Sequence, residues 1–113
     1  MWVFDERGFF SAVQVMGKQD QLMVRSRFKG DLENLKRAAG IKSKIIETPK
    51  ADYRWRIICS KEAFGEYLHR AALDIDYPNY KASLTPERDK LYLRIWSIMK
   101  MAQDQPMLKG IEF

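Results

Sequence analysis

The sequence predicts a single α+β domain, with a mainly antiparallel five-stranded sheet and helices packed on one face. Two observations indicate this fold class. Residues 22–29 and 53–58 alternate with a period of two, which is typical of strands that bury one face. Later segments repeat apolar residues at helical spacing instead. The resulting order of elements, β-β-β-α-β-β-α-α, describes one sheet covered by helices.

The first part of the chain predicts three strands joined by short loops. Residues 2–4 form the first strand, and residues 9–15 form the second. The loop at residues 17–20 reverses the chain into the strand at 22–29, and such short loops favour an antiparallel meander. One face of the second strand is expected to carry Phe9, Ser11, Val13 and Val15.

A first helix and a hairpin are expected next. The carboxylate of Asp31 is predicted to cap the helix, and Gly40 is predicted to end it. Residues 44–48 and 53–59 then pair as two strands across the turn-forming residues 49–52. The inner face of the helix carries Leu32, Leu35 and Ala39.

Two further helices complete the predicted fold. Ser60 caps a helix that runs from residue 61 to about residue 74. Pro78 cannot continue that helix, because an interior proline would clash and remove a hydrogen bond. Thr85 caps the last helix, and Pro86 occupies the first-turn position that tolerates proline. The apolar stripe of this last helix consists of Leu91, Ile95, Ile98 and Ala102.

The last two helices need an apolar sheet face to cover. The rows through Val13, Val24 and Trp55 are predicted to supply it, which leaves the arginine rows on the uncovered face. Residues 1–113 would form one domain. Residues 105–113 show no periodicity and are expected to form a frayed tail.

Composition favours a cytoplasmic protein that contacts anions. Residues 1–7 lack the pattern of a signal peptide, and no apolar run approaches the ~20 residues that span a bilayer, so no membrane contact is expected. Twenty Lys and Arg against fifteen Asp and Glu give a net charge of +5. The single cysteine, Cys59, excludes an intramolecular disulfide and is expected to be a buried small side chain.

Patterns for catalysis, metals and cofactors are weak. His69 is the only histidine, and its spacing from Glu66 supplies too few ligands for a zinc or di-iron site. Glu47 and Lys50 faintly resemble a nuclease pair but lack a further carboxylate on a neighbouring strand. The glycines stand singly, so there is no phosphate-binding loop. We therefore expect no catalytic residue, no metal and no cofactor.

The arginines of the two alternating segments form the candidate binding site. A guanidinium group is a fixed charge with planar donors that suit phosphate or carboxylate. Aromatic and basic residues in the loop before the last helix would extend the site by stacking on bases. The predicted binding residues are Arg25, Arg27, Arg54, Arg56, Tyr77, Tyr80 and Lys81. The simpler alternative is that the arginines form a solvated face and the tyrosines seal the core.

Short motifs over most of the chain carry a resemblance to a known family. They are residues 1–4 with 8–13, 24–27 with 31–32, 51–53 with Arg56, 75–81, and Tyr92 with Trp96. Together they resemble a widespread family of short bacterial proteins of unknown function, some of them on phages and other mobile elements. The chain departs from that pattern at Ser26, where alanine is frequent, and at Tyr80, where phenylalanine is usual. The resemblance implies no activity.

The favoured function is a non-enzymatic accessory or regulatory protein that binds an anionic partner through an arginine-rich sheet face. That partner would be a nucleic acid or an acidic protein surface. One alternative is a small nuclease or nucleotide-modifying enzyme in which Glu47, Asp52 or Asp76 acts as acid, base or metal ligand. Another is a structural homo-oligomer. Strand order, oligomeric state and possible pairing of the arginines with Asp52 or Asp76 stay open at this point.

Overall fold

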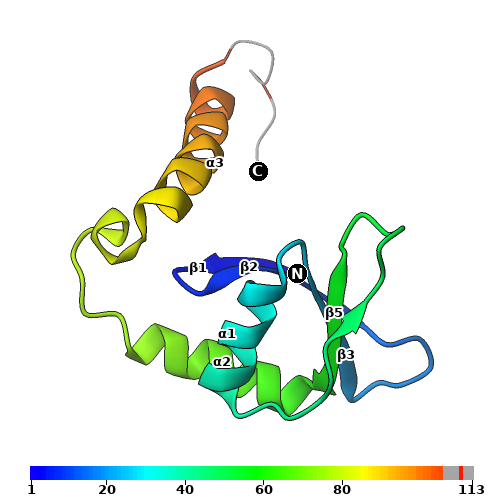
Figure 1. Ribbon diagram of the computed structural model, residues 1–113. Coiled ribbons are helices and arrows are strands. Elements are labelled where there is room, and N and C mark those ends of the chain that lie inside the picture. Colours follow the sequence, from blue (N-terminus) through cyan, green and yellow to red (C-terminus); the bar gives the residue numbers. More distant parts are fainter. Residues whose placement is uncertain (106–109, 111–113) are drawn as a thin grey trace. The chain divides into compact units, whose positions relative to one another are not determined.

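The computed structural model describes residues 1–105 and residue 110 of the chain. The chain divides into two compact units, Met1–Asp76 and Tyr77–Phe113. The first unit contains the sheet and two helices, and the second contains a 3-10 turn and one long helix (Figure 1). The predicted α+β class is confirmed. A single domain over residues 1–113 stays a prediction, and most of the expected tail at 105–113 lies outside the described residues.

Within the described residues, five strands form one antiparallel sheet in the order β1-β2-β3-β5-β4. The strands are β1 (Trp2–Asp5), β2 (Gly8–Gln14), β3 (Gln21–Ser26), β4 (Ile46–Glu47) and β5 (Trp55–Ser60). The first three make the expected meander, and β4 and β5 make the expected hairpin. The two arginine-bearing strands, β3 and β5, are neighbours in the sheet.

Helices α1 (Lys29–Ala39) and α2 (Lys61–Leu73) lie side by side and pack on one face of this sheet (Figure 1). Two predicted helix ends are confirmed, the start of α2 at Ser60 and the end of α1 at Gly40. Ser60 Oγ accepts a hydrogen bond from the Ala63 N–H at the start of α2. Gly40 ends α1 with φ 66°, a left-handed conformation that glycine adopts without a Cβ clash.

The core lies between these two helices and the sheet. Its completely buried side chains come from β2, β3, β5 and α1: Phe10, Val24, Ile57, Leu32 and Leu35. Helix α2 adds Phe64 and Tyr67, which are each 3% exposed. Cys59 joins the same core at 8% exposure, as the sequence predicted for a small buried side chain.

The prediction that Val13 lies on the covered face is wrong. Val13 pairs with Met23, whereas Ala12 pairs with Val24, so Val13 points to the uncovered side and is 38% exposed. Phe10 and Ala12 fill the covered side instead. Both sides of this strand carry apolar residues, so a period of two cannot decide which side is buried.

The predicted helix cap at Asp31 is also wrong. Helix α1 begins at Lys29, with Phe28 as the N-cap residue, and Asp31 lies in the first turn. The Asp31 side chain is 3% exposed, and its Oδ2 accepts a 3.0 Å hydrogen bond from the Phe9 N–H. The carboxylate therefore ties the start of β2 to α1. Gly8 permits this approach, because a Cβ at residue 8 would lie 2.5 Å from the Asp31 Cβ.

The second unit contains the 3-10 turn Tyr80–Ser83 and helix α3 (Pro86–Asp104). Thr85 Oγ1 accepts from the Arg88 N–H, and Pro86 stands in the first turn, as predicted. The predicted apolar stripe of this helix is not a buried face, since Leu91 and Ile98 are 47% and 64% exposed. No helix in the described part of the chain is long and apolar enough to cross a membrane.

Candidate functional site

The strand register places two arginines directly opposite each other on the uncovered face of the sheet. Arg25 of β3 pairs with Arg56 of β5. The same cross-strand row continues through Ser11 to Trp2 on one side and to Ile46 on the other. Residues paired in this way point to the same face, with Cα atoms about 4.5–5.5 Å apart. The row therefore runs across all the strands of the sheet, with the two arginines at its centre.

Tyr53 lies at the centre of this group of arginines. The guanidinium carbons of Arg25 and Arg27 lie 4.7 Å and 4.2 Å from the centroid of its ring. Arg56 Nη2 lies 3.5 Å from the Tyr53 carbonyl oxygen, to which it donates. Tyr53 is only 5% exposed as a result. We call Arg25, Arg27, Arg56 and Tyr53 the arginine cluster.

The arginine cluster has no acidic partner among the described residues. Arg25 Nη2 donates a 2.7 Å hydrogen bond to Ser11 Oγ, and Arg56 Nη1 donates to Met23 Sδ at 3.2 Å. Asp52, a possible partner in the sequence, instead accepts from the Tyr53 N–H. The Nε atoms of Arg25 and Arg56 are buried and have no hydrogen-bond partner in the described part of the chain. Within residues 1–105, three guanidinium groups thus lie together without a carboxylate to balance their charge.

Arg54 stands apart from the arginine cluster, although the alternation predicted it in the same row as Arg56. Its Nη2 and Nε donate to Glu47 Oε1 at 2.8 Å and 3.0 Å. Strand β5 begins only at Trp55, so the alternation does not extend back to Tyr53 and Arg54. The alternation of residues 53–58 would put Tyr53 on the same face as Trp55, but Tyr53 packs with Arg25 and Arg27. The chain bends just before β5. Thr48 Oγ1 lies 3.0 Å from the Tyr53 carbonyl oxygen and 3.1 Å from that of Arg54, and it stabilises the bend by donating a hydrogen bond to them.

Tyr77, Tyr80 and Lys81 belong to the second unit. The two tyrosine rings lie 5.8 Å apart at an angle of 46°. Lys81 Nζ lies 5.5 Å from the centroid of the Trp96 ring. Asn79 Oδ1 accepts from the Lys81 N–H and so starts the 3-10 turn. The structure brings together Arg25, Arg27 and Arg56 of the predicted binding residues.

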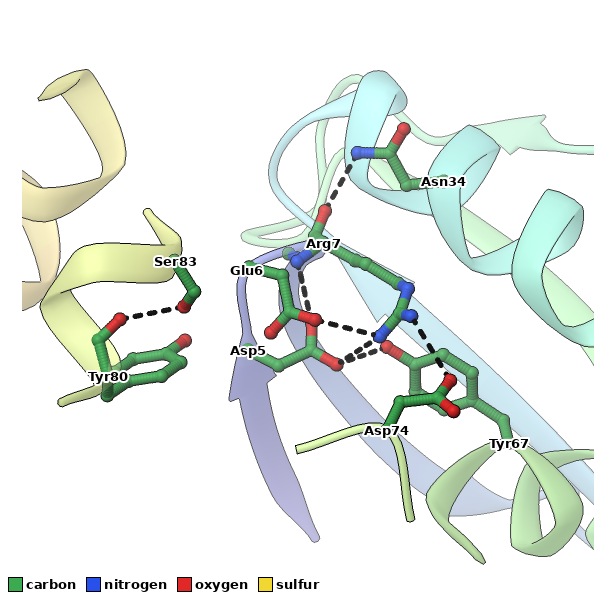
Figure 2. Close-up of polar contacts among 9 residues, drawn as sticks. Asp5, Glu6, Arg7, Asn34, Tyr67, Asp74, Tyr80 and Ser83 are labelled. Atoms are coloured by element: carbon green, nitrogen blue, oxygen red, sulfur yellow. Dashed lines mark hydrogen bonds and ion pairs between the residues drawn. The ribbon is translucent and has the colours of Figure 1, made fainter. Parts of the chain in front are cut away.

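A second polar network, which sequence reasoning missed, surrounds Arg7 at the turn between β1 and β2 (Figure 2). Arg7 Nη1 lies 3.4 Å from Asp5 Oδ2 and 3.1 Å from Glu6 Oε1. The Tyr67 hydroxyl donates to the same Asp5 oxygen, and Asn34 Nδ2 donates to the Arg7 carbonyl oxygen at 2.9 Å. The network joins the turn to α1 and α2, and its carboxylates already have partners. It is therefore a structural network.

Tyr67→Phe is expected to lower the free energy of unfolding by about 1.5–3 kcal/mol near neutral pH, because a hydrogen bond to a carboxylate is lost. Burial, and next the hydrogen bond to Asp5 and its charge, raise the pKa of Tyr67 above its ordinary value of 10.0. A group whose pKa is raised on folding stabilises the protein fully below the unfolded pKa and less as the pH rises above it. The advantage of wild type should therefore shrink above pH 10.0. Urea unfolding of wild type and Tyr67→Phe from neutral pH to above pH 10.0 measures this difference. A difference in the free energy of unfolding that stays constant with pH would contradict the prediction.

The carboxylates proposed for an enzyme are surface groups. Glu47, Asp52 and Asp76 are all exposed, and Glu47 is paired with Arg54. His69 is exposed on α2. The described residues contain no group of three or more His, Cys, Asp or Glu side chains arranged to hold a metal ion.

Comparison of the chain with known protein families, with curated proteins and with solved structures finds no match. The resemblance to a family of short bacterial and phage proteins therefore stays a prediction.

Proposed function

We propose that this chain is a non-enzymatic accessory or regulatory protein that binds an anionic partner through the arginine cluster. The observation that carries the proposal is the meeting of Arg25, Arg27 and Arg56 around Tyr53 without a carboxylate within the described residues. Guanidinium groups in such an arrangement suit the paired oxygens of phosphate or carboxylate groups.

The electrostatics of the pair at the centre support an anionic partner. Like charges directly opposite each other on an antiparallel sheet destabilise it. Arg25 and Arg56 are such a pair. A bound phosphate or carboxylate would reduce this repulsion. Relief of the repulsion would therefore favour anion binding, a contribution that widely spaced, solvated arginines would not make.

The stacking of two arginines on Tyr53 also favours binding. Arg25 and Arg27 are already restricted in the free protein by their contacts with the ring. Binding then costs less side-chain entropy than it would for freely rotating arginines. The hydrogen bond from Arg25 to Ser11 restricts one of the two further. The cluster is thus a preorganised cationic surface.

Replacing Arg25, Arg27 and Arg56 together with Gln tests the proposal. We expect the triple variant to lose binding to heparin, used as a polyanion, and to elute from immobilised heparin at much lower salt. Its free energy of unfolding should change by no more than about 1 kcal/mol, because lost stacking and relieved repulsion oppose each other.

The matched control removes the same charge elsewhere, by replacing the exposed residues Arg37, Arg70 and Arg94 with Gln. If binding depends on the cluster, this control should retain most of the heparin affinity. Equal losses in both triple variants would mean that net charge alone attracts the polyanion. A loss of ~3–5 kcal/mol in the cluster variant would mean that the arginines are a structural network, and either result would overturn the proposal.

A further inference from the structure

Exposed aromatic side chains lie on the same sheet face as the arginine cluster. Trp2 belongs to the cross-strand row of Arg25 and Arg56, and it is 72% exposed. Phe4 follows two residues later on the same side of β1 and is 38% exposed. Two strand spacings separate Trp2 from Arg25, so their Cα atoms lie roughly 10 Å apart. Both side chains are long enough to contact one extended ligand.

These aromatic rings are held in position by Phe9. The rings of Phe4 and Phe9 stack with centroids 5.2 Å apart and planes inclined by 2°. Trp2 contacts the same Phe9 ring at 6.0 Å in an edge arrangement. Such pairs are favourable beyond the area they bury, so the three rings form a supported group on β1 and β2. Phe4 and Trp2 still expose part of their surface to solvent.

We propose that the anionic partner is a single-stranded nucleic acid, with a base stacked on Trp2 and phosphates on Arg25, Arg27 and Arg56. This inference rests on the proposed function, because it names the partner of the same site. Aromatic side chains next to a positively charged surface are the combination that binds single strands, since every base has a face to stack. Paired bases in a duplex are already stacked on each other and do not offer those faces.

Other occupants fit this face less well. An acidic protein surface would neutralise the arginines, but its carboxylates offer no planar ring system to stack on the exposed ring of Trp2. A second copy of the chain could cover the rings, yet face-to-face contact would bring two arginine clusters together and add like-charge repulsion. The single strand satisfies both parts of the surface. Its affinity is expected to fall steeply with salt, because phosphate contacts release counterions.

Fluorescence anisotropy with a labelled single-stranded oligonucleotide of mixed sequence tests the inference on the full chain. Trp2→Ala should weaken binding roughly tenfold or more, which is the scale of one stacked base. Trp2→Phe should restore most of it. Heparin, which has no bases, should bind Trp2→Ala as well as wild type. Trp96→Ala, at an exposed tryptophan of α3, is the matched control and should bind normally.

Intrinsic tryptophan fluorescence gives a second readout. A stacked base should quench the emission of Trp2, so the oligonucleotide should quench wild type more than Trp2→Phe, and heparin should quench neither. A duplex of the same sequence should bind more weakly than the single strand and produce little quenching. Equal binding of single strand and duplex, without quenching, would overturn the inference.

The two proposals fail in distinguishable ways. If the triple arginine variant loses heparin and the oligonucleotide while Trp2→Ala changes neither affinity, the anion-binding function stands and the stacking inference is wrong. The stacking inference is also wrong if an acidic peptide such as polyglutamate binds to the cluster and the oligonucleotide does not. If the triple variant binds both polyanions as well as wild type, both proposals are wrong.

Discussion

Phe10→Ala is expected to lower the free energy of unfolding by about 3–5 kcal/mol, the usual cost of removing a completely buried aromatic side chain. Phe10 is 0% exposed and lies in the core with Val24 and Ile57. Its ring also meets that of Tyr67 edge-on, with centroids 6.2 Å apart. The substitution leaves a cavity between the sheet and both helices of the first unit. Urea unfolding monitored by circular dichroism measures the loss.

Val13→Ala is the control, because it removes an apolar side chain from the same strand on the opposite face. Val13 is 38% exposed, so we expect a loss below about 1 kcal/mol. The comparison asks directly which face of β2 is buried. A larger loss for Val13→Ala than for Phe10→Ala would mean that the strand faces are inverted and that the aromatic and arginine residues do not share a surface.

Gly8→Ala should lower the free energy of unfolding by about 2–5 kcal/mol. The new Cβ would lie 2.5 Å from the Asp31 Cβ and 2.6 Å from its Cγ, closer than real atoms pack. Asp31 would have to move, which strains the packing and weakens its hydrogen bond with the Phe9 N–H. Thermal and urea unfolding both measure this effect.

Gly65→Ala is the matched control for the same chemical change. Gly65 lies inside α2, and no heavy atom of the described residues outside the helix backbone lies within 4 Å of the added Cβ. The alanine should stabilise the protein by about 0.5–1 kcal/mol, because glycine is unfavourable inside a helix. A Gly8→Ala variant as stable as wild type would show that the turn and α1 do not approach each other this closely.

The parts of the fold that could be predicted are those where a short segment carries the whole signal. In β3 and β5 the arginines alternate with apolar residues, and the predicted placement of Val24 and Trp55 on the covered face is correct. Ser60 as the N-cap and Pro86 in the first helical turn gave the starts of α2 and α3. Such local signals do not depend on which strands become neighbours.

Sequence patterns predict the wrong position where contacts with a distant part of the chain decide it. Both sides of β2 are apolar, so the face that contains Phe10 is selected by the helices that cover it. Asp31 was assigned to a cap because of its neighbours in sequence, but its carboxylate binds the Phe9 N–H, 22 residues away. Tyr53 left its expected row because the loop before β5 bends before the strand begins.

The sequence predicts the charged residues of the candidate site but not the aromatic residues that lie beside them. Arg25, Arg27 and Arg56 were identified from alternation alone, and the register then placed two of them face to face. The position of Trp2 beside them depends on the pairing of β1 with β2 and of β2 with β3. Periodicity contains no information about such pairing, so an exposed tryptophan near the N-terminal end gave no signal of its own.

Because Cys59 is buried in the core, the reactivity of its thiol can report how often that core opens. Desolvation raises the pKa of this thiol, so it stays protonated and reacts slowly while the core is closed. Because Cys59 is the only cysteine, a thiol reagent added under native conditions would modify one site, at a rate governed by how often β5 separates from the helices. Labelling kinetics would therefore rank Phe10→Ala and Gly8→Ala without denaturant.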